Sequence, residues 1–325
     1  MSTLVLSRSD ISKLAVPADY HRAVARGFRR YAERRISTPA PMELPAAGGA
    51  FHIKGATVND QESGVAAVKI NSNFPRNSER FGLPTIQGAI IVFDSISGSP
   101  LAILDSAEIT LRRTAAASAV AADLLAKSSA DSLLIWGCGV QGRAHAEAFM
   151  PLRRFRRACF YDIDAAKARR VARDFGPIAT AIEDPVRAAL ESDVIVTTTT
   201  AQSVLPLPRK LAPGAFVAAV GADNPFKSEI PPALMTHSAI ITDVTDQCVV
   251  MGDLRAAIAA GAVRREDTRA ELAEVVVGAR PGRTSEEETI IFDSTGAAFE
   301  DLAAAEMLVE RAKAEGLGAW IDLQK

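Results

Sequence analysis

The sequence has 325 residues and a net charge of −2, so it is long enough for two domains and has no general attraction for nucleic acid or an anionic membrane. Its three cysteines, Cys138, Cys159 and Cys248, are odd in number and widely spaced, which indicates reduced thiols rather than a disulfide framework or a zinc site. The N-terminal residues lack the apolar core of a signal peptide, and no apolar run approaches the roughly 20 residues of a membrane span, so we expect a cytoplasmic protein.

The first 127 residues are expected to form a small domain of helices and short strands. Residues 9–35 have the spacing of one or two helices, and residues 107–127 form a long alanine-rich helix candidate. Between them, strand candidates lie at 50–58, 64–71, 88–94 and 101–104. The stretch Ser97-Gly98-Ser99-Pro100 predicts the turn of a hairpin that joins the last two of these strands.

From residue 132 onward, strand and helix patterns alternate, as in an α/β sheet. The strand candidates lie at 132–136, 158–161, 193–199, 215–220, 239–243 and 289–293. Continuous apolar runs such as Val194–Val196 are typical of parallel strands covered on both faces. Residues 297–315 predict an amphipathic helix that packs back on the N-terminal half. We therefore expect an α/β protein, with one domain at 128–296 and a second, α+β domain built from 1–127 and 297–325.

A complete G-x-G-x-x-G motif follows the strand candidate at 132–136. Gly137 allows a tight turn, Gly139 lets the backbone approach a pyrophosphate, and Gly142 allows close packing of helix on strand. The expected cofactor contacts in this turn are Gly137, Gly139, Val140, Gln141 and Gly142. Asp162 ends the next strand, where a carboxylate can bind ribose hydroxyls and repel a 2′-phosphate. The motif therefore predicts a Rossmann-type domain that binds NAD rather than NADP.

Further stretches resemble the ornithine cyclodeaminase/μ-crystallin family, in the right order over roughly residues 60–305. They are Val68-Lys69-Ile70, Gly82-Leu83-Pro84-Thr85, Pro100-Leu101-Ala102, Arg113-Thr114-Ala115-Ala116, Val220-Gly221-Ala222-Asp223, and Asp293-Ser294-Thr295-Gly296 with Glu300-Asp301. The resemblance implies a Rossmann domain, a substrate and dimerisation domain built from both chain ends, and a homodimer. It also implies hydride transfer between a nicotinamide and the Cα–N unit of an amino or imino acid.

The resemblance assigns the catalytic acid/base to Asp223 and a catalytic, carboxylate-binding lysine to Lys69. It also implies cofactor contacts at Thr85, Arg113, Thr200, Gly221, Asp223, Lys227 and Ser294, and a substrate contact at Thr295. From the residues alone, other interpretations stay open. Lys69 points away from Val68 and Ile70 and is then a solvated lysine on the outer face of its strand. Asp223 is then a turn or capping residue, and Arg113 a helix arginine that reaches solvent.

Two departures from the family pattern concern the substrate. Many members have Pro-Pro-Arg where this chain has Pro39-Ala40-Pro41, so a carboxylate-binding arginine is missing. Many have Met-Pro-Ala where this chain has Lys54-Gly55-Ala56. If Lys54 faces the pocket, it can bind a substrate carboxylate and disfavours a substrate with an ammonium tail. The alternative is that Lys54 reaches outward into solvent.

We expect an NAD(H)-dependent amino-acid dehydrogenase or imine reductase that acts on a small amino or imino acid. Lys54 makes a dicarboxylic acid a candidate substrate. A redox-neutral, ammonia-releasing ornithine cyclodeaminase and a non-enzymatic ligand-binding protein are the alternatives. The four histidines, His21, His52, His145 and His237, lack metal-ligand spacing, so no metal is expected.

Overall fold

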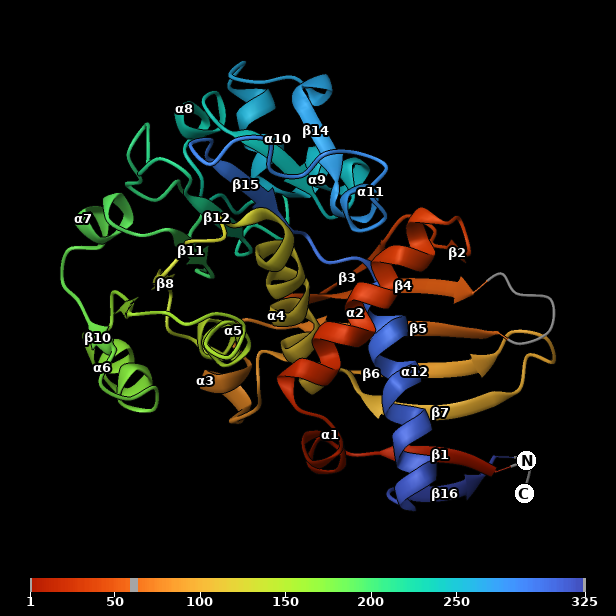
Figure 1. Ribbon diagram of the computed structural model, residues 1–325. Coiled ribbons are helices and arrows are strands. Elements are labelled where there is room, and N and C mark those ends of the chain that lie inside the picture. The colour runs from red at the N-terminus through yellow and green to blue at the C-terminus, as the bar shows by residue number, and fades with distance from the viewer. Residues whose placement is uncertain (1, 59–63, 324–325) are drawn as a thin grey trace. The chain divides into compact units, whose positions relative to one another are not determined.

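The computed structural model describes residues 2–58 and 64–323 (Figure 1). It divides into two compact units, the first made of Met1–Thr114 and Ala297–Lys325 and the second of Ala115–Gly296. The division falls inside helix α4 (Ser106–Leu125), whereas the sequence predicted a boundary after residue 127. The difference arises because the first turns of α4 bind within the first unit, where Arg113 pairs with Asp301.

The first unit is built on a mixed sheet with the strand order β16-β1-β7-β6-β5-β4-β2, and β3 also pairs with β4. The strands are β1 (Ser2–Leu6), β2 (Ile36–Ser37), β3 (Met42–Ala46), β4 (Gly49–Val58), β5 (Val65–Asn73), β6 (Ile86–Asp94), β7 (Pro100–Asp105) and β16 (Ala319–Asp322). β6 and β7 are antiparallel, and Gly98 has a φ of 73° in the turn between them, which confirms the predicted hairpin. β1 and β16, which the sequence analysis did not predict, pair with each other antiparallel.

The helices of the first unit are α1 (Arg8–Leu14), α2 (Pro17–Ala32), α3 (Asn77–Phe81) and α12 (Ala298–Glu315). Helix α12 contacts α2 and strands β4, β5 and β6, and Figure 1 shows it lying along this sheet. It was predicted to be amphipathic, but it is buried around most of its circumference because α2 covers the side that faces away from the sheet. One face of the sheet is therefore closed by helices, and this face holds the charged residues described below.

The second unit is an eight-stranded parallel sheet with the order β10-β9-β8-β11-β12-β15-β13-β14. Its strands are β8 (Ser132–Trp136), β9 (Arg157–Tyr161), β10 (Ala179–Ala181), β11 (Val194–Thr197), β12 (Phe216–Ala219), β13 (Ala239–Thr242), β14 (Thr268–Glu271) and β15 (Ile290–Asp293). The chain runs outward from β8 through β9 to β10 and then returns to place β11 on the other side of β8. This reversal is the topological switch point at which open α/β sheets bind their ligands.

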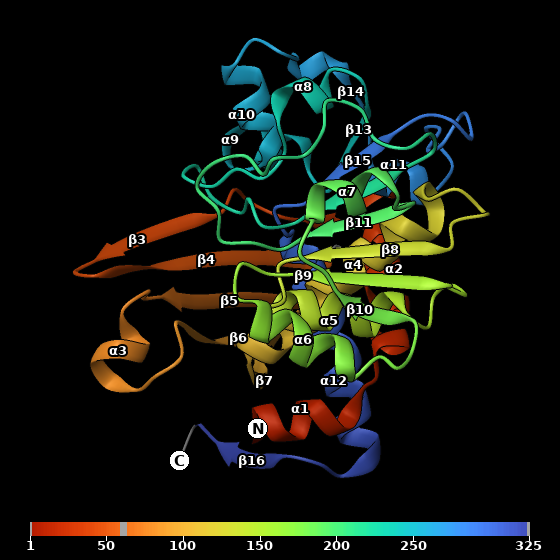
Figure 2. The same cartoon turned by 90° about the vertical axis from the view of Figure 1, so that its left-hand side faces the viewer.

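The helices of the second unit are α5 (Val140–Phe149), α6 (Ala165–Arg173), α7 (Pro185–Leu190), α8 (Pro232–Met235), α9 (Thr245–Met251), α10 (Asp253–Ala259) and α11 (Leu272–Val276), together with the short 3₁₀ helix η1 (Arg265–Asp267). Figure 2 shows α6 beside β9 and β10, and α5 contacts β8 and β11. The arrangement is that of a Rossmann-type domain, as the sequence predicted. Among the described residues, no helix combines the length and the apolar character that a membrane crossing requires.

Candidate functional site

The glycine-rich turn after β8 has the geometry that each glycine was expected to provide. Gly137 has a φ of 105°, a conformation that L side chains rarely adopt. A Cβ added to Gly142 would lie 1.8 Å from the carbonyl oxygen of Gly137, so only glycine fits there. A Cβ added to Gly139 would meet nothing within 4 Å, so the backbone at this residue borders open space.

Helix α5 begins at Val140 and points its first amides out of the turn. Its first backbone hydrogen bond runs from Arg143 N to the Gly139 oxygen, at 3.1 Å. The N–H groups of Val140, Gln141 and Gly142 precede that bond and have no acceptor within the helix. Free amides and the positive end of the helix dipole favour an anion here, so the turn fits the pyrophosphate of a dinucleotide.

Asp162 follows β9 and is fixed against the glycine-rich turn. Its Oδ2 atom accepts the backbone N–H of Cys138 at 2.8 Å, and Oδ1 accepts that of Asp164 at 2.9 Å. Each oxygen has a second lone pair, which can accept a ribose hydroxyl. The side chain of Ile163 beside it is 96% exposed. The carboxylate is thus held in the position where the sequence motif predicted it.

Two further segments lie at the same edge of the sheet, after β11 and β12. The hydroxyl of Thr198 donates to the Gly137 oxygen at 2.9 Å, which joins the segment after β11 to the glycine-rich turn, and Thr200 lies exposed just beyond it. After β12, Gly221 is buried and Asp223 is exposed. The Asp223 Oδ1 atom accepts hydrogen bonds from Lys227 Nζ at 2.8 Å and from Asn224 Nδ2 at 3.1 Å.

Ser294 and Thr295, which follow β15, are buried and held by a carboxylate that the sequence analysis missed. Asp243, at the end of β13, accepts the backbone N–H groups of Thr295 at 2.7 Å and Gly296 at 2.6 Å through Oδ2. The Thr295 hydroxyl also lies 3.3 Å from Oδ1 of the same residue. Asp243 therefore fixes the backbone of the segment that carries Ser294, the predicted cofactor contact, and Thr295, the predicted substrate contact.

In the first unit, Lys69 is buried and paired with Asp301. Its side chain is 5% exposed, and Nζ lies 2.5 Å from Asp301 Oδ2. Burial lowers the pKa of Lys69 to about 7, although the charge of Asp301 opposes the shift. The interpretation of Lys69 as a solvated lysine on an outer face is therefore wrong. Lys69 lies on the face closed by helices, and Val68 and Ile70 point to the more open face.

Arg113, on α4, binds the same carboxylate. Its Nε donates to Asp301 Oδ1 at 2.9 Å, and Nη1 donates to Glu300 Oε2 at 2.8 Å. Burial favours the neutral acid at Asp301, but the charges of Arg113 and Lys69 outweigh it and lower the pKa of Asp301. Asp301 is thus an ionised carboxylate that holds two cations. The cofactor contact expected of Arg113 stays a prediction.

Lys54 lies directly opposite Lys69 on the neighbouring strand. The two residues are register partners of β4 and β5, and cross-strand partners point to the same face of a sheet. Lys54 is half-buried, and its charge acts on both Lys69 and Asp301. The structure thus brings together Lys54, Lys69 and Arg113. Thr85 lies apart, between α3 and β6, where its carbonyl accepts the N–H of Phe74 at 2.9 Å.

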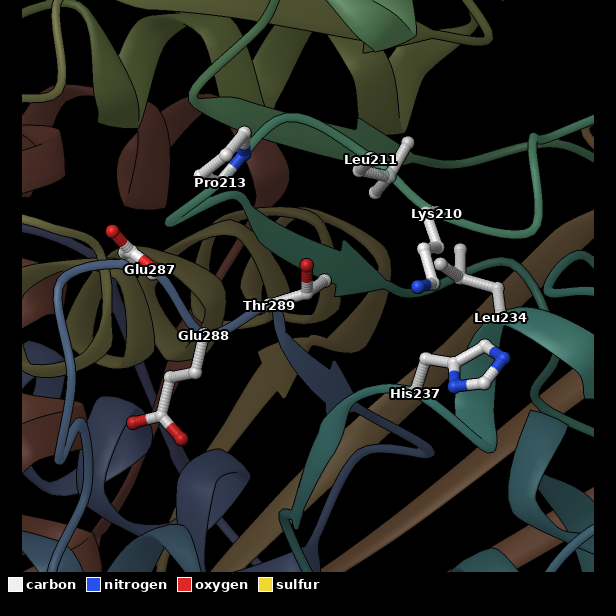
Figure 3. Close-up of a pocket in the computed structure, with 8 residues that line it drawn as sticks. All are labelled: Lys210, Leu211, Pro213, Leu234, His237, Glu287, Glu288 and Thr289. Carbon is white, nitrogen blue, oxygen red and sulfur yellow. The ribbon is translucent and has the colours of Figure 1, made fainter.

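A pocket in the second unit lies at the other edge of its sheet. It is lined by Lys210, Leu211, Pro213, Leu234, His237, Glu287, Glu288 and Thr289, which precede or flank the starts of β12, β13 and β15 (Figure 3). Figure 3 shows the Glu288 carboxylate directed away from Lys210 and His237. That carboxylate instead accepts Arg269 Nη2 at 2.7 Å. The polar groups do not converge, so this pocket is not a candidate active site.

Comparison with known proteins shows the family of the chain. The model of the ornithine cyclodeaminase/mu-crystallin family matches residues 1–316. The chain belongs to this family. An archaeal alanine dehydrogenase, a dimer with bound NAD, is similar to this chain with a TM-score of 0.94 and 29% identity, over 99% of this chain and 100% of the other.

Two further solved structures of similar proteins carry a nicotinamide cofactor. The iminosuccinate reductase of Paracoccus denitrificans, in complex with NAD⁺, gives a TM-score of 0.92 at 30% identity, over 99% and 100% of the two chains. The Δ1-pyrroline-2-carboxylate reductase of Thermococcus litoralis, in complex with NADH and L-proline, gives 0.91 at 28% identity, over 98% and 99%. These similarities extend over nearly the whole of each chain.

Proposed function

We propose that this chain is an NAD(H)-dependent oxidoreductase that interconverts a small imino acid and the corresponding amino acid. The observation that carries the proposal is the buried Lys69, held 2.5 Å from Asp301 on the face closed by helices. A buried ammonium is costly, and a lysine placed so is typical of a catalytic group rather than of a surface charge. The similarity to three nicotinamide-linked enzymes of the Cα–N unit supports the same function.

NAD is the cofactor of the proposal, and the second unit is the domain that binds it. The turn from Gly137 to Gly142 and the amides of α5 fit the pyrophosphate, and Asp162 fits the adenosine ribose. When bound, NADH supplies the hydride that reduces the imine carbon. The remaining steps are the work of the protein: it orients the substrate and moves a proton.

Lys69 and Asp223 have different roles in this reaction. The Lys69 ammonium orients the substrate carboxylate, and Arg113 supports it by keeping Asp301 ionised. Asp223 is exposed, lies at the carboxyl end of a parallel strand, and gives or takes the proton at the amine nitrogen. The hydrogen bond from Lys227 holds its carboxylate in one orientation.

A spectrophotometric assay tests the proposed function against its two alternatives. With 2-oxo acids and ammonia or amines, we expect steady consumption of NADH. A cyclodeaminase would release ammonia from ornithine with no net change in NADH, because the hydride returns to the product. A ligand-binding protein would do neither. Absence of NADH consumption over a full panel of oxo acids contradicts the proposal.

The substrate class is proposed from Lys54, which shares a sheet face with Lys69. A second cation beside the first favours a substrate with a second carboxylate over one with an ammonium tail. After desolvation, about 1–2 kcal/mol of such discrimination should remain. The similarity to an iminosuccinate reductase supports this choice.

Replacing Lys54 by methionine is expected to separate two roles of this residue. Activity with an imino-dicarboxylate should fall by roughly 5–30-fold, and activity with the imine of pyruvate should stay or rise. Lys210→Met, which removes a cation at the other edge of the second unit, is the control. An equal loss with both substrates would assign Lys54 to the α-carboxylate and contradict the proposed side-chain specificity.

A homodimer formed through the first unit is also proposed. The face of its sheet opposite Lys69 carries an apolar row made of two neighbouring sets of register partners, which are Ile53 with Ile70, and Val68 with Ile91 and Ile103. These residues are half-buried or exposed, and Ile70 is 39% exposed. A second copy of the same row would bury it, and the dimeric state of the similar alanine dehydrogenase supports this arrangement.

Ile70→Glu is expected to convert the dimer into monomers, because it places a charge in the apolar row. Sedimentation velocity at micromolar concentration measures this directly. Leu190→Glu, at an exposed site at the end of α7, is the control and should remain dimeric. A wild-type protein that sediments only as a monomer contradicts the dimer.

A cytoplasmic location is also part of the proposed function. Cys138, Cys159 and Cys248 are all free and buried, as is typical of proteins in a reducing compartment.

A further inference from the structure

We propose that Glu229 is a positioning residue, whose buried carboxylate fixes the ends of β11 and β12 and thereby places Asp223 for proton transfer. The inference rests on the proposed function, because it assigns Asp223 the acid/base role. Glu229 lies six residues after Asp223, at the far end of the same loop. Neither the motif nor the family resemblance singled it out.

The carboxylate of Glu229 joins two segments that follow neighbouring strands. Oε1 accepts the backbone N–H of Thr199 at 2.6 Å, in the segment after β11. Oε2 accepts the backbone N–H of Gly221 at 2.7 Å, in the segment after β12. The Thr197 hydroxyl also donates to Oε2, at 2.6 Å. One fully buried side chain thus ties together the two strand ends beside the switch point.

Gly221 is shaped for this contact. A Cβ added to it would lie 2.5 Å from Glu229 Oε1 and 2.5 Å from the carbonyl oxygen of Thr199. Any other residue would push the two segments apart. Asp223 lies two residues beyond Gly221 in the segment after β12. The position of Gly221 therefore constrains the position of the Asp223 backbone.

A second buried carboxylate, that of Asp253, binds the backbone of Glu229, and a third, that of Asp293, binds the backbone of Asp253. Asp253 Oδ1 accepts the backbone N–H groups of Glu229 at 2.7 Å and Ile230 at 2.9 Å, and the Ser228 hydroxyl at 3.0 Å. Asp293, at the end of β15, accepts the N–H groups of Asp253 at 3.2 Å and Leu254 at 2.8 Å. The series Asp293, Asp253, Glu229 therefore runs from the end of β15 to the ends of β11 and β12.

The three carboxylates of this series accept hydrogen bonds from backbone amides and side-chain hydroxyls. Among the described residues, no set of three or more histidine, cysteine, aspartate or glutamate side chains is arranged to hold a metal ion. Burial, and then the charge of Asp253, raise the pKa of Glu229 to about 7, while the bonds from Thr197 and Thr199 oppose the shift. Burial of a carboxylate is unfavourable, and the hydrogen bonds from the backbone N–H groups that Glu229 fixes offset this cost.

Glu229→Gln tests the inference, because glutamine has nearly the same shape but must turn its NH₂ group toward either the Thr199 or the Gly221 amide. Asp193→Asn is the matched control. Asp193 Oδ2 also accepts three donors, which are Asp131 N, Ser132 N and the Ser132 hydroxyl, and its Oδ1 pairs with Lys127 Nζ at 2.6 Å. Asp193 directly precedes β11 and binds the amino end of β8, at the other edge of the sheet.

Hydrogen exchange without cofactor is the first measurement. The amides of Thr199 and Gly221 should exchange about tenfold faster or more in Glu229→Gln, and those of Asp131 and Ser132 should not change. Asp193→Asn should give the reverse pattern. Binding of ADP-ribose, which we expect Asp162 and the glycine-rich turn to hold, should be unchanged in both variants. Thr199 and Gly221 amides that stay fully protected in Glu229→Gln overturn the inference.

Turnover is the second measurement. Glu229→Gln should lower kcat about tenfold or more with little change in the KM for the imino acid, and Asp193→Asn should leave both near the wild-type values. In an Asp223→Asn background, Glu229→Gln should add little further loss, because the group that it places is already gone. Full additivity of the two losses contradicts the inference.

Further measurements apply if a variant does not fold or if the protein reduces no imine. If Glu229→Gln does not fold, Glu229→Asp keeps the charge but draws the carboxylate back by one methylene, and the same exchange pattern is expected. If neither variant folds, fast exchange of Thr199 and Gly221 in the wild-type protein overturns the inference, and slow exchange supports it. If the wild-type protein reduces no imine, the proposed function fails, and the exchange experiment still decides whether Glu229 fixes these strand ends.

Discussion

Replacing Asp223 by asparagine is expected to lower kcat by roughly 10²–10⁴, the range in which a positioned acid/base contributes to catalysis. The change is nearly isosteric, and the amide oxygen can still accept the hydrogen bond that Lys227 donates at 2.8 Å. The glycine-rich turn and Asp162 are untouched, so the Kd for NADH should stay close to that of the wild type. Steady-state kinetics and NADH fluorescence measure the two quantities.

Asp246→Asn is a suitable control for this experiment. Asp246 is also an exposed aspartate of the second unit with one cationic partner, Arg265 Nη2 at 2.5 Å. Its replacement should leave kcat unchanged. If Asp223→Asn retains near-normal turnover, the proton comes from another group, and Lys69, with its pKa near 7, becomes the candidate.

A preference for NADH over NADPH of on the order of 100-fold is the second large effect that we expect. The Asp162 carboxylate is anchored by the Cys138 and Asp164 amides, so it cannot move away from a 2′-phosphate without breaking those bonds. Binding NADPH would replace its bonds to ribose hydroxyls with repulsion between two anions. The ratio of kcat/KM for the two cofactors measures this preference.

Asp162→Asn should lower the ratio about tenfold or more, because the amide keeps an acceptor for the Cys138 N–H while it removes the charge. Asp164→Asn is the control. Asp164 caps α6 by accepting the Ala166 N–H at 3.0 Å, and its replacement should change the ratio much less. Equal efficiency of the wild-type protein with NADH and NADPH would refute the assigned role of Asp162.

Local sequence patterns predicted the elements of the cofactor-binding domain around the glycine-rich turn. The strand at 132–136, the three glycines and the acidic residue after the next strand lie close together in the sequence, and each has a steric or electrostatic reason that acts locally. The structure places β8 at the predicted residues. Short strands at sheet edges, such as β10 and β14, were missed because few residues carry their pattern.

The direction of Lys69 could not be predicted from its strand. Alternation along β5 separates two faces but does not say which of them is covered, and the cover comes from α12 at the far end of the chain. The partner of Lys69, Asp301, belongs to that helix. Its stretch was noted in the resemblance, but no role followed from it because the pairing depends on the tertiary fold.

The buried acids Glu229, Asp243 and Asp253 were missed for a similar reason. Each follows or precedes an apolar run, as capping residues also do, and a sequence does not distinguish an exposed cap from a buried acceptor. One signal was available. Glu229 stands directly before Ile230-Pro231-Pro232, and an acid beside a run that must be buried needs donors of its own.

Transfer of deuterium from NADH that carries deuterium at both C4 positions of the nicotinamide tests the central claim most directly. With an accepted oxo acid and ammonia, the amino acid product should carry deuterium at Cα, as mass spectrometry of its fragments would reveal, and one deuterium should appear for each NADH consumed. The Asp223→Asn variant should form the same labelled product more slowly. A product without deuterium at Cα, or product formed with no loss of NADH, would contradict the account.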